Sequence, residues 1–249
     1  MNNLYNEILL ASGCSWTDTN YNSSHHPGEI FDFPKWPELL AKKLGMKALN
    51  VGLCGAGFEY IYQSLIKNIT TKDIGLVIAG WTKASRRDYR NSGYKVSRKG
   101  NKTTTYYQKW GNMQWDTHGD NRYFINRMMM YYYSFQQVCK SLGIKYKQVH
   151  MIGSHETATS YPNYETWPVA IGKVLGREEH YEYMTKHPLY NKIDEEHFIG
   201  WPGTKLLGGI SMKSMLDSED DNFISKLDRH PNKKGQEKIA DYLYRVINK

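Results

Sequence analysis

The strongest constraint on the fold is a pattern that recurs in the first third of the chain. Residues 7–12 contain a short apolar run that stops at Gly13, and residues 76–79 form another that stops at Gly80. Between them, residues 36–44 and 58–69 carry apolar side chains at helical spacing, and residues 47–51 read as a further strand. Short continuous apolar runs are typical of strands buried on both faces of a parallel sheet. Their alternation with helices predicts right-handed βαβ units.

The rest of the chain extends this pattern with two long interruptions. Residues 125–142 predict a longer helix closed by Gly143, residues 144–152 a fourth strand, and the residues from Gln236 onward a C-terminal helix. Periodicity is lost over about 83–121 and 154–225, which we interpret as insertions after the third and fourth strands. We therefore predict an α/β protein: a three-layer α/β/α sandwich around a flavodoxin-like parallel sheet of about five strands, as one domain of residues 1–249.

Composition excludes several classes of protein. No apolar run approaches the roughly 20 residues of a membrane-spanning helix, and no signal peptide is recognisable, so we expect a cytoplasmic protein without a membrane partner. The 3 cysteines are too few and too scattered for a disulfide framework or a zinc site. We expect neither a metal nor a cofactor, and nothing in the sequence indicates an oligomeric state.

The net charge of +8 favours anionic partners through long-range attraction. Basic and aromatic residues that could hold a phosphate backbone with stacked bases are gathered in the first insertion: Arg86, Arg87, Arg90, Lys95, Arg98, Lys99, Tyr106 and Tyr107. A solvated insertion is the favoured interpretation. A hydrolase that acts on a nucleotide or nucleic-acid substrate, or a nucleic-acid partner, is the less favoured alternative.

The candidate chemistry lies at the two ends of the chain. Ser15 follows the first strand, at the edge where open α/β sheets bind ligands. His230 precedes Pro231 and the last helix, so its loop should be held in place. An imidazole there could accept a hydroxyl proton, and Asp228 could fix its tautomer. Either residue alone is weak support for catalysis, because serines at strand ends and histidines at helix-entry turns are common.

Taken together, four ordered blocks resemble those of the SGNH/GDSL hydrolases. They are Gly13-Cys14-Ser15-Trp16-Thr17, residues 50–57 (Asn-Val-Gly-Leu-Cys-Gly-Ala-Gly), Gly80-Trp81-Thr82, and Asp228 with His230 and Pro231. The likeness is greatest to small divergent members from phage and bacterial genomes. It brackets most of the chain but leaves both insertions unmatched.

The resemblance implies a role for each block. Ser15 would be the nucleophile, with its own amide, the Gly55 amide and Thr82 forming the oxyanion hole, and His230 with Asp228 would complete a triad. Trp16, Asp18 and Trp81 are candidate substrate contacts. The implied activity is hydrolysis of a small ester, such as an O-acetylated sugar or metabolite, by acyl transfer. A binding or structural protein that has lost catalysis is a second hypothesis.

The blocks also depart from the family pattern. Thr82 stands where the family has asparagine, and Asp228 stands two residues before the histidine instead of three. Asp217, Asp220 and Asp221 are therefore alternative orienting acids, and Gly57 is an alternative to Gly55. Cys14 is an alternative nucleophile, although alternation along an extended segment would point it away from Ser15. His25 and His26 lack further ligands at metal spacing.

Overall fold

The computed structural model describes residues 7–71, 73–96, 104–113, 121–154 and 177–249. Its centre is a five-stranded sheet of order β2-β1-β3-β6-β7 in which every pair is parallel. The strands are β1 (Ile8–Ser12), β2 (Lys47–Asn50), β3 (Ile74–Trp81), β6 (Tyr146–His150) and β7 (Phe198–Ile199). This order is that of flavodoxin-like sheets and confirms the predicted fold class. The two-residue β7, inside the second insertion, is too short to leave a periodic signal.

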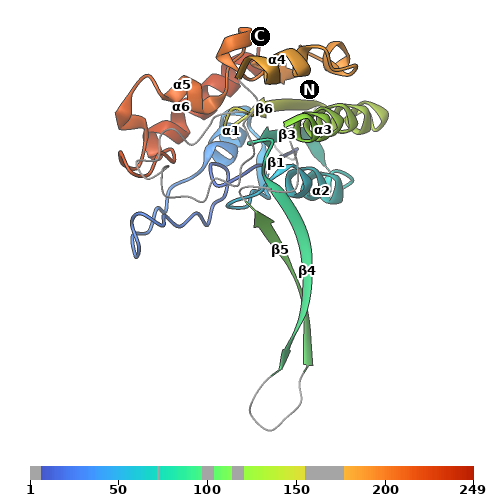
Figure 1. Cartoon of the computed structure of the whole chain (residues 1–249). Coiled ribbons are helices and arrows are strands. Elements are labelled where there is room, and N and C mark those ends of the chain that lie inside the picture. Colours follow the sequence, from blue (N-terminus) through green and yellow to red (C-terminus); the bar gives the residue numbers. More distant parts are fainter. Residues whose placement is uncertain (1–6, 72, 97–103, 114–120, 155–176) are drawn as a thin grey trace.

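Helices cover both faces of the sheet (Figure 1). On one face lie α1 (Trp36–Leu44), α5 (Met212–Leu216) and α6 (Lys233–Ile247); on the other lie α2 (Phe58–Asn68) and α3 (Asn121–Ser141). The second insertion also holds α4 (Arg177–Thr185) and the 3-10 turns η3 (Tyr190–Lys192), η4 (Lys205–Leu207) and η5 (Asp220–Asn222). The predicted helix signals act as expected, since Pro37 lies in the first turn of α1 and Gly45 caps its end with a φ of 68°.

The first insertion contains a β-hairpin that the sequence did not reveal. β4 (Arg87–Val96) and β5 (Thr104–Met113) pair antiparallel over ten residues each and project from the domain as a separate two-stranded ribbon (Figure 1). Neither segment alternates cleanly between apolar and polar residues, so no period of two marks these strands in the sequence. The predicted insertion after the third strand thus contains two strands that the sequence did not predict.

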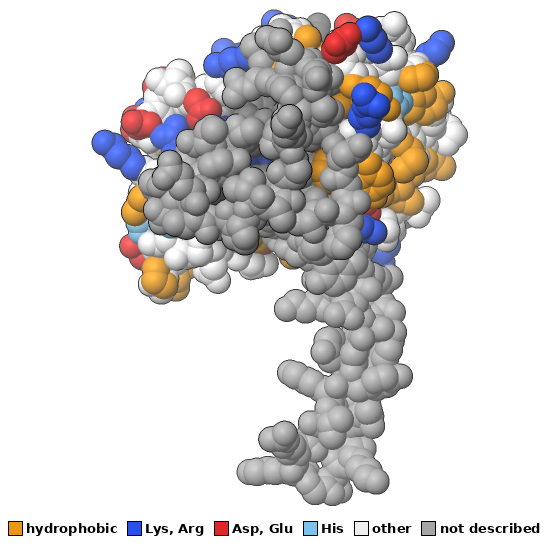
Figure 2. All heavy atoms as spheres, in the orientation of Figure 1, with side chains coloured by type: hydrophobic (Ala, Val, Ile, Leu, Met, Phe, Trp, Pro, Cys, Tyr) orange, Lys and Arg blue, Asp and Glu red, His pale blue; other side chains and the backbone are white. Residues whose placement is uncertain are grey.

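The described surface carries charges of both signs. On the face seen in Figure 2, Lys and Arg side chains are interspersed with acidic ones around the top of the domain. Several of these charges form ion pairs between elements, such as Lys43 of α1 with Asp241 of α6 at 2.7 Å. Within the described residues, no helix combines the length and the apolar character needed to cross a membrane.

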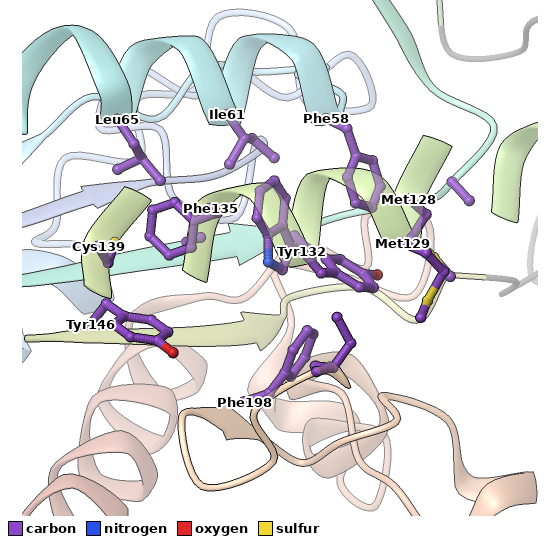
Figure 3. Packing of buried hydrophobic residues seen from close by; sticks show 14 of the residues in the cluster. Phe58, Ile61, Leu65, Met128, Met129, Tyr132, Phe135, Cys139, Tyr146 and Phe198 are labelled. Atoms are coloured by element: carbon purple, nitrogen blue, oxygen red, sulfur yellow. The ribbon is translucent and has the colours of Figure 1, made fainter. Parts of the chain in front are cut away.

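Two apolar clusters occupy the two sides of the sheet, as strand alternation requires. Leu10 of β1 belongs to the cluster under α2 and α3, whereas its neighbours Leu9 and Ala11 belong to the cluster under α1 and α6. One face of α3 packs into the first cluster through five side chains (Figure 3): Met128, Met129, Tyr132, Phe135 and Cys139. The burial of these side chains holds the helices on the sheet.

One polar pair lies inside the first cluster. The Tyr132 hydroxyl and His150 Nε2 are 2.6 Å apart, and both side chains are fully buried. Burial lowers the pKa of His150 to about 4, so its ring is neutral near pH 7 and can share this hydrogen bond without a counter-charge. His150 is therefore a core residue and not a free base.

Candidate active site

Ser15 lies in a tight turn directly after β1, at the carboxyl edge of the sheet. The turn is closed by hydrogen bonds from the amides of Thr17 and Asp18 to the carbonyl of Cys14. A β-carbon at Gly13 would lie 2.2 Å from Thr17 Oγ1 and 3.2 Å from the carbonyl oxygen of Gly80, so only glycine fits between the turn and β3. Ser15 is 5% exposed, and its hydroxyl faces the last loop of the chain.

His230 is brought to Ser15 by the loop that precedes α6. The loop is held by the bridge between Phe223 and Pro231, and Asn232 caps the helix by accepting the Gly235 amide at 3.0 Å. Gln236 then ties the helix to the nucleophile turn by donating to the carbonyl of Trp16 at 3.0 Å. As a result, Ser15 Oγ and His230 Nε2 lie 2.8 Å apart although they are 215 residues apart in sequence.

Asp228 completes the contact on the far side of the ring. Its Oδ1 lies 2.5 Å from His230 Nδ1 and also accepts the His230 amide at 3.0 Å. Burial alone would raise the pKa of Asp228, but the hydrogen bond and charge of His230, together with the Ser23 hydroxyl, hold this pKa well below its usual range. The carboxylate is therefore ionised and accepts the Nδ1 proton, which leaves Nε2 free to accept the proton of Ser15.

The alternative orienting acids are bound elsewhere. Asp217 and Asp220 form ion pairs with Arg229 at 3.1 and 2.5 Å, and Asp221 pairs with Lys234 at 2.5 Å. Asp228 thus reaches the imidazole although it stands only two residues before His230. The turn brings its carboxylate next to both the backbone amide and Nδ1 of His230.

Two residues that the sequence analysis did not single out also contact Asp228. The hydroxyls of Tyr21 and Ser23 both donate to Asp228 Oδ2, the former at 2.9 Å. The Tyr21 hydroxyl oxygen is also 2.8 Å from His230 Nδ1, and the two rings stack with centroids 4.1 Å apart. No motif or periodicity marks these residues, since only the folded loop carries them to the other end of the chain.

The second block forms a loop between β2 and α2 that leaves one amide unused. In this loop the Cys54 amide donates to Asp18, the Ala56 amide to the carbonyl of Leu53, and the Gly57 amide to Asp88. Among the described residues the amide of Gly55 has no acceptor. Gly55 has a φ of 77°, which glycine adopts without strain. The Gly57 amide already donates to Asp88, so Gly55 is the better candidate for the oxyanion-hole amide.

The structure corrects the substrate-contact prediction for both tryptophans. Trp81 is fully buried, stacks on Phe58 at 5.1 Å and donates its indole N–H to Gln148 at 2.9 Å. Trp16 is 2% exposed and packs edge-on against Phe223 in the other cluster. Both are enclosed by protein side chains, because the strand and turn that carry them point these rings into the core.

Asp18 is likewise bound within the protein. It is 6% exposed, and its two carboxylate oxygens accept the amides of Cys54 and Asn20, each at 2.8 Å. Both oxygens are occupied by backbone amides, so the interpretation of Asp18 as a substrate contact is corrected to that of a link between the nucleophile turn and the Gly55 loop.

Thr82 follows β3 at the same edge of the sheet. It is fully buried, and its hydroxyl has no hydrogen-bond partner among the described residues. A buried unpaired hydroxyl costs free energy, on the order of 1–3 kcal/mol. A ligand oxygen that accepts a hydrogen bond from the Thr82 hydroxyl would offset this cost.

The remaining candidates lie away from this chemistry. Cys14 is fully buried in the cluster under α1 and α6, so its thiol points away from the site. His26 contacts Ser225 and Glu29 at the surface. In the described part of the chain, one group has ligand atoms close enough for a metal, namely Asp194, Glu196 and His197. It precedes β7 at the opposite edge of the sheet, and Asp194 is paired with Lys140 at 2.7 Å.

A second buried carboxylate anchors the hairpin next to the Gly55 loop. Asp88, at the start of β4, accepts the amides of Gly57 and Tyr60 at 2.9 Å and so caps the N-terminus of α2. Arg86 donates to the carbonyl of Ala56 at 3.3 Å. Burial raises the pKa of Asp88 to about 6, although the two amides favour the carboxylate. The base of the hairpin therefore helps to shape the loop that carries the Gly55 amide.

Comparisons with known proteins find a similarity in fold but none in sequence. No protein-family model and no curated protein sequence matches the chain. Among solved structures, a protein from Desulfitobacterium hafniense DCB-2 described as a lipolytic protein of the G-D-S-L family is similar, with a TM-score of 0.51, 14% identity, and coverage of 96% of this chain and 98% of that one. LAE5, an alpha/beta hydrolase from the metagenome of Lake Arreo, Spain, gives a TM-score of 0.44 at 11% identity, with 97% and 95% coverage. The chain therefore has the α/β fold of a G-D-S-L family structure over nearly its whole length.

Proposed function

We propose that the protein is a serine hydrolase of the SGNH/GDSL type that cleaves a small ester by acyl transfer. The observation that carries the proposal is the pair of contacts made by one imidazole. His230 Nε2 lies 2.8 Å from Ser15 Oγ, and its Nδ1 lies 2.5 Å from a buried carboxylate oxygen of Asp228. A hydroxyl, a base and an orienting acid in this order form the machinery of nucleophilic acyl transfer.

The chemistry follows from the protonation states. His230 Nε2 takes the Ser15 proton as Oγ attacks the carbonyl carbon of the ester, and Asp228 stabilises the resulting imidazolium. The tetrahedral intermediate collapses when the imidazolium returns this proton to the leaving alcohol, which forms an acyl-Ser15 ester. Water activated by the same nitrogen then attacks the acyl carbon and regenerates the hydroxyl.

Three donors are available for the oxyanion. The amides of Ser15 and Gly55 have no acceptor among the described residues, and the buried Thr82 hydroxyl has no partner there. Losing one such donor typically costs about 10²- to 10³-fold in kcat. A hydroxyl in place of the family's asparagine is a shorter donor, so we expect Thr82 to contribute less than the two amides.

The substrate class is an ester with a small acyl group, for example an O-acetylated sugar or a similar metabolite. The lipolytic description of the structural neighbour supports ester chemistry. The Ser15 side of the site is also nearly enclosed, since Ser15 is 5% exposed, whereas the His230 side chain is 24% exposed. Such enclosure favours a compact acyl group at the nucleophile.

The proposal is tested with Ser15→Ala, assayed with p-nitrophenyl acetate and a fluorophosphonate probe. We expect kcat to fall by about 10⁶-fold and labelling to disappear. The matched control is Ser141→Ala at the end of α3, whose exposed hydroxyl contacts only the carbonyl of Val138. Turnover or labelling of Ser15→Ala at the wild-type level would refute the serine mechanism.

The site geometry bears on two alternative functions, a non-catalytic binding protein and a protein that acts on nucleic acid. The short Asp228 spacing no longer argues for a non-catalytic binding protein, because the carboxylate reaches the ring; the Thr82 departure remains its support. The nucleic-acid alternative depends on side chains of the hairpin, most of which lie outside the described residues, and Arg86 is buried against Ala56. It would require polynucleotide binding with a steep salt dependence.

A further inference from the structure

We infer that Tyr21 and Ser23 are positioning residues of the catalytic acid and base, and that they stand in for the longer spacing usually found between these two groups. The inference rests on the proposed function. It concerns the segment that follows the nucleophile turn and crosses over to the loop of Asp228 and His230.

Four hydrogen bonds to Asp228 divide evenly between its oxygens. Oδ1 accepts the Nδ1 proton and the amide of His230, at 2.5 and 3.0 Å. Oδ2 accepts the hydroxyls of Tyr21 and Ser23. In a two-residue spacing the carboxylate and the ring belong to one short turn, and the donors of that turn, the amide and Nδ1 of His230, both bond to Oδ1. The two hydroxyls fix the second oxygen and thereby fix the plane of the carboxylate against the ring.

The direction of each hydroxyl is determined by its other contacts. Ser23 Oγ accepts the amides of His25 and His26, both at 3.2 Å, so its proton points to Asp228. Tyr21 donates to Oδ2, and its oxygen also lies 2.8 Å from His230 Nδ1, beside the bond between Nδ1 and Asp228 Oδ1. Burial and the charge of Asp228 raise the pKa of Tyr21 far above its usual value, which keeps the hydroxyl protonated.

The Tyr21 ring adds a steric restraint. It stacks on the imidazole at 4.1 Å with an angle of 28° between the planes, and it is 8% exposed. The imidazole is thus held at one edge by Asp228 and over one face by Tyr21, with Nε2 directed at Ser15. Neither Tyr21 nor Ser23 touches the reacting atoms, so they act through Asp228 and His230.

The experiment compares Tyr21→Phe, Ser23→Ala and the double variant in the full chain, with p-nitrophenyl acetate as substrate. Tyr21→Phe keeps the stacked ring and removes the hydroxyl. We expect it to lower kcat by about tenfold with KM within about twofold, because only the orientation of the base changes. The control is Tyr62→Phe, whose hydroxyl makes a comparable bond of 2.8 Å to Ser134 between α2 and α3 and should leave both constants unchanged.

The pH–rate profile separates positioning from a purely structural role. Ser23→Ala removes a donor from Asp228 and leaves more negative charge facing the ring, which favours the protonated imidazole. We expect the acid limb of kcat/KM to move to higher pH by about half a unit. A change in folding alone would alter the amplitude of the profile and the melting temperature without moving this limb.

The outcomes are distinct. Wild-type kcat and an unmoved acid limb in Tyr21→Phe and Ser23→Ala, with an active wild type, would overturn the positioning role and leave the proposed function intact. Loss of activity together with loss of cooperative melting in both single variants would also overturn it, since the residues would then be structural. A wild type that neither turns over the ester nor labels would overturn the proposed function and this inference with it.

Discussion

Two buried aspartates at the same edge of the sheet have opposite acidities. Asp228, behind His230, is held ionised by a hydrogen bond to a ring that can carry positive charge. Asp88, at the base of the hairpin, accepts the backbone amides of Gly57 and Tyr60, and burial raises its pKa to about 6. Burial penalises the charge in both places, so the partner decides the outcome. Asp228 therefore stays ionised at neutral pH, whereas Asp88 titrates at about pH 6.

The largest expected effect lies in the first region. Asp228→Asn should lower kcat for p-nitrophenyl acetate by about 10⁴-fold, because an amide cannot stabilise the imidazolium and favours the wrong ring tautomer. Steady-state kinetics and the rate of fluorophosphonate labelling measure this loss. Asp88→Asn is the matched substitution, and an equal loss in both variants would break the distinction between the two aspartates.

Asp18 lies between the Ser15–His230–Asp228 site and the loop that Asp88 anchors. It accepts the Cys54 amide, next to Gly55. Asp18→Ala should lower kcat by up to about 10²-fold, because the Gly55 amide loses its aim at the oxyanion. KM should change little. The measurement is kcat and KM together with a thermal melt. An unchanged kcat in a folded variant would show that the loop needs no support from Asp18.

The pH dependence of stability distinguishes the two acids by its sign. Asp88 binds a proton more tightly in the folded chain, so its contribution should weaken as pH rises from about 4 to about 6, by roughly 3 kcal/mol at most. Asp228 has a lowered pKa, so its contribution is present above the ordinary aspartate range and is lost as pH falls below it.

Urea unfolding of the wild type and Asp88→Asn between pH 4 and 7 measures the Asp88 part. The variant should gain stability relative to the wild type as pH rises through this interval. A difference between the two proteins that stays constant with pH would contradict the raised pKa of Asp88.

The smallest effect on activity and stability is expected when the outer part of the hairpin is removed. Replacing residues 91–109 with a two-residue turn keeps Arg86 and Asp88 and removes the ribbon that projects from the domain (Figure 1). Turnover of p-nitrophenyl acetate and the melting temperature should stay near the wild-type values. A large loss of activity would mean that the ribbon itself takes part in the site.

Much of the fold was predictable because its signals are local. Buried strands that end in glycine, and helices with an apolar stripe and a glycine cap such as Gly45, are written into neighbouring residues. The hairpin and β7 were missed because strands without apolar alternation and a strand of two residues leave no such pattern. Trp16 and Trp81 were misassigned because sequence does not tell which side of a strand end faces the core.

The sequence by itself determined the order of the long parallel strands β1, β2, β3 and β6 and of the helices α1, α2, α3 and α6, together with the residue types of a candidate hydrolytic site. Hydrophobic periodicity and short motifs depend only on near neighbours. The tertiary structure alone decided which acid meets His230, that Tyr21 and Ser23 join it, and that Asp18 turns inward to the Gly55 loop. These contacts join segments that only the folded sheet brings together, because hydrogen bonds between distant segments require a geometry that no local pattern encodes.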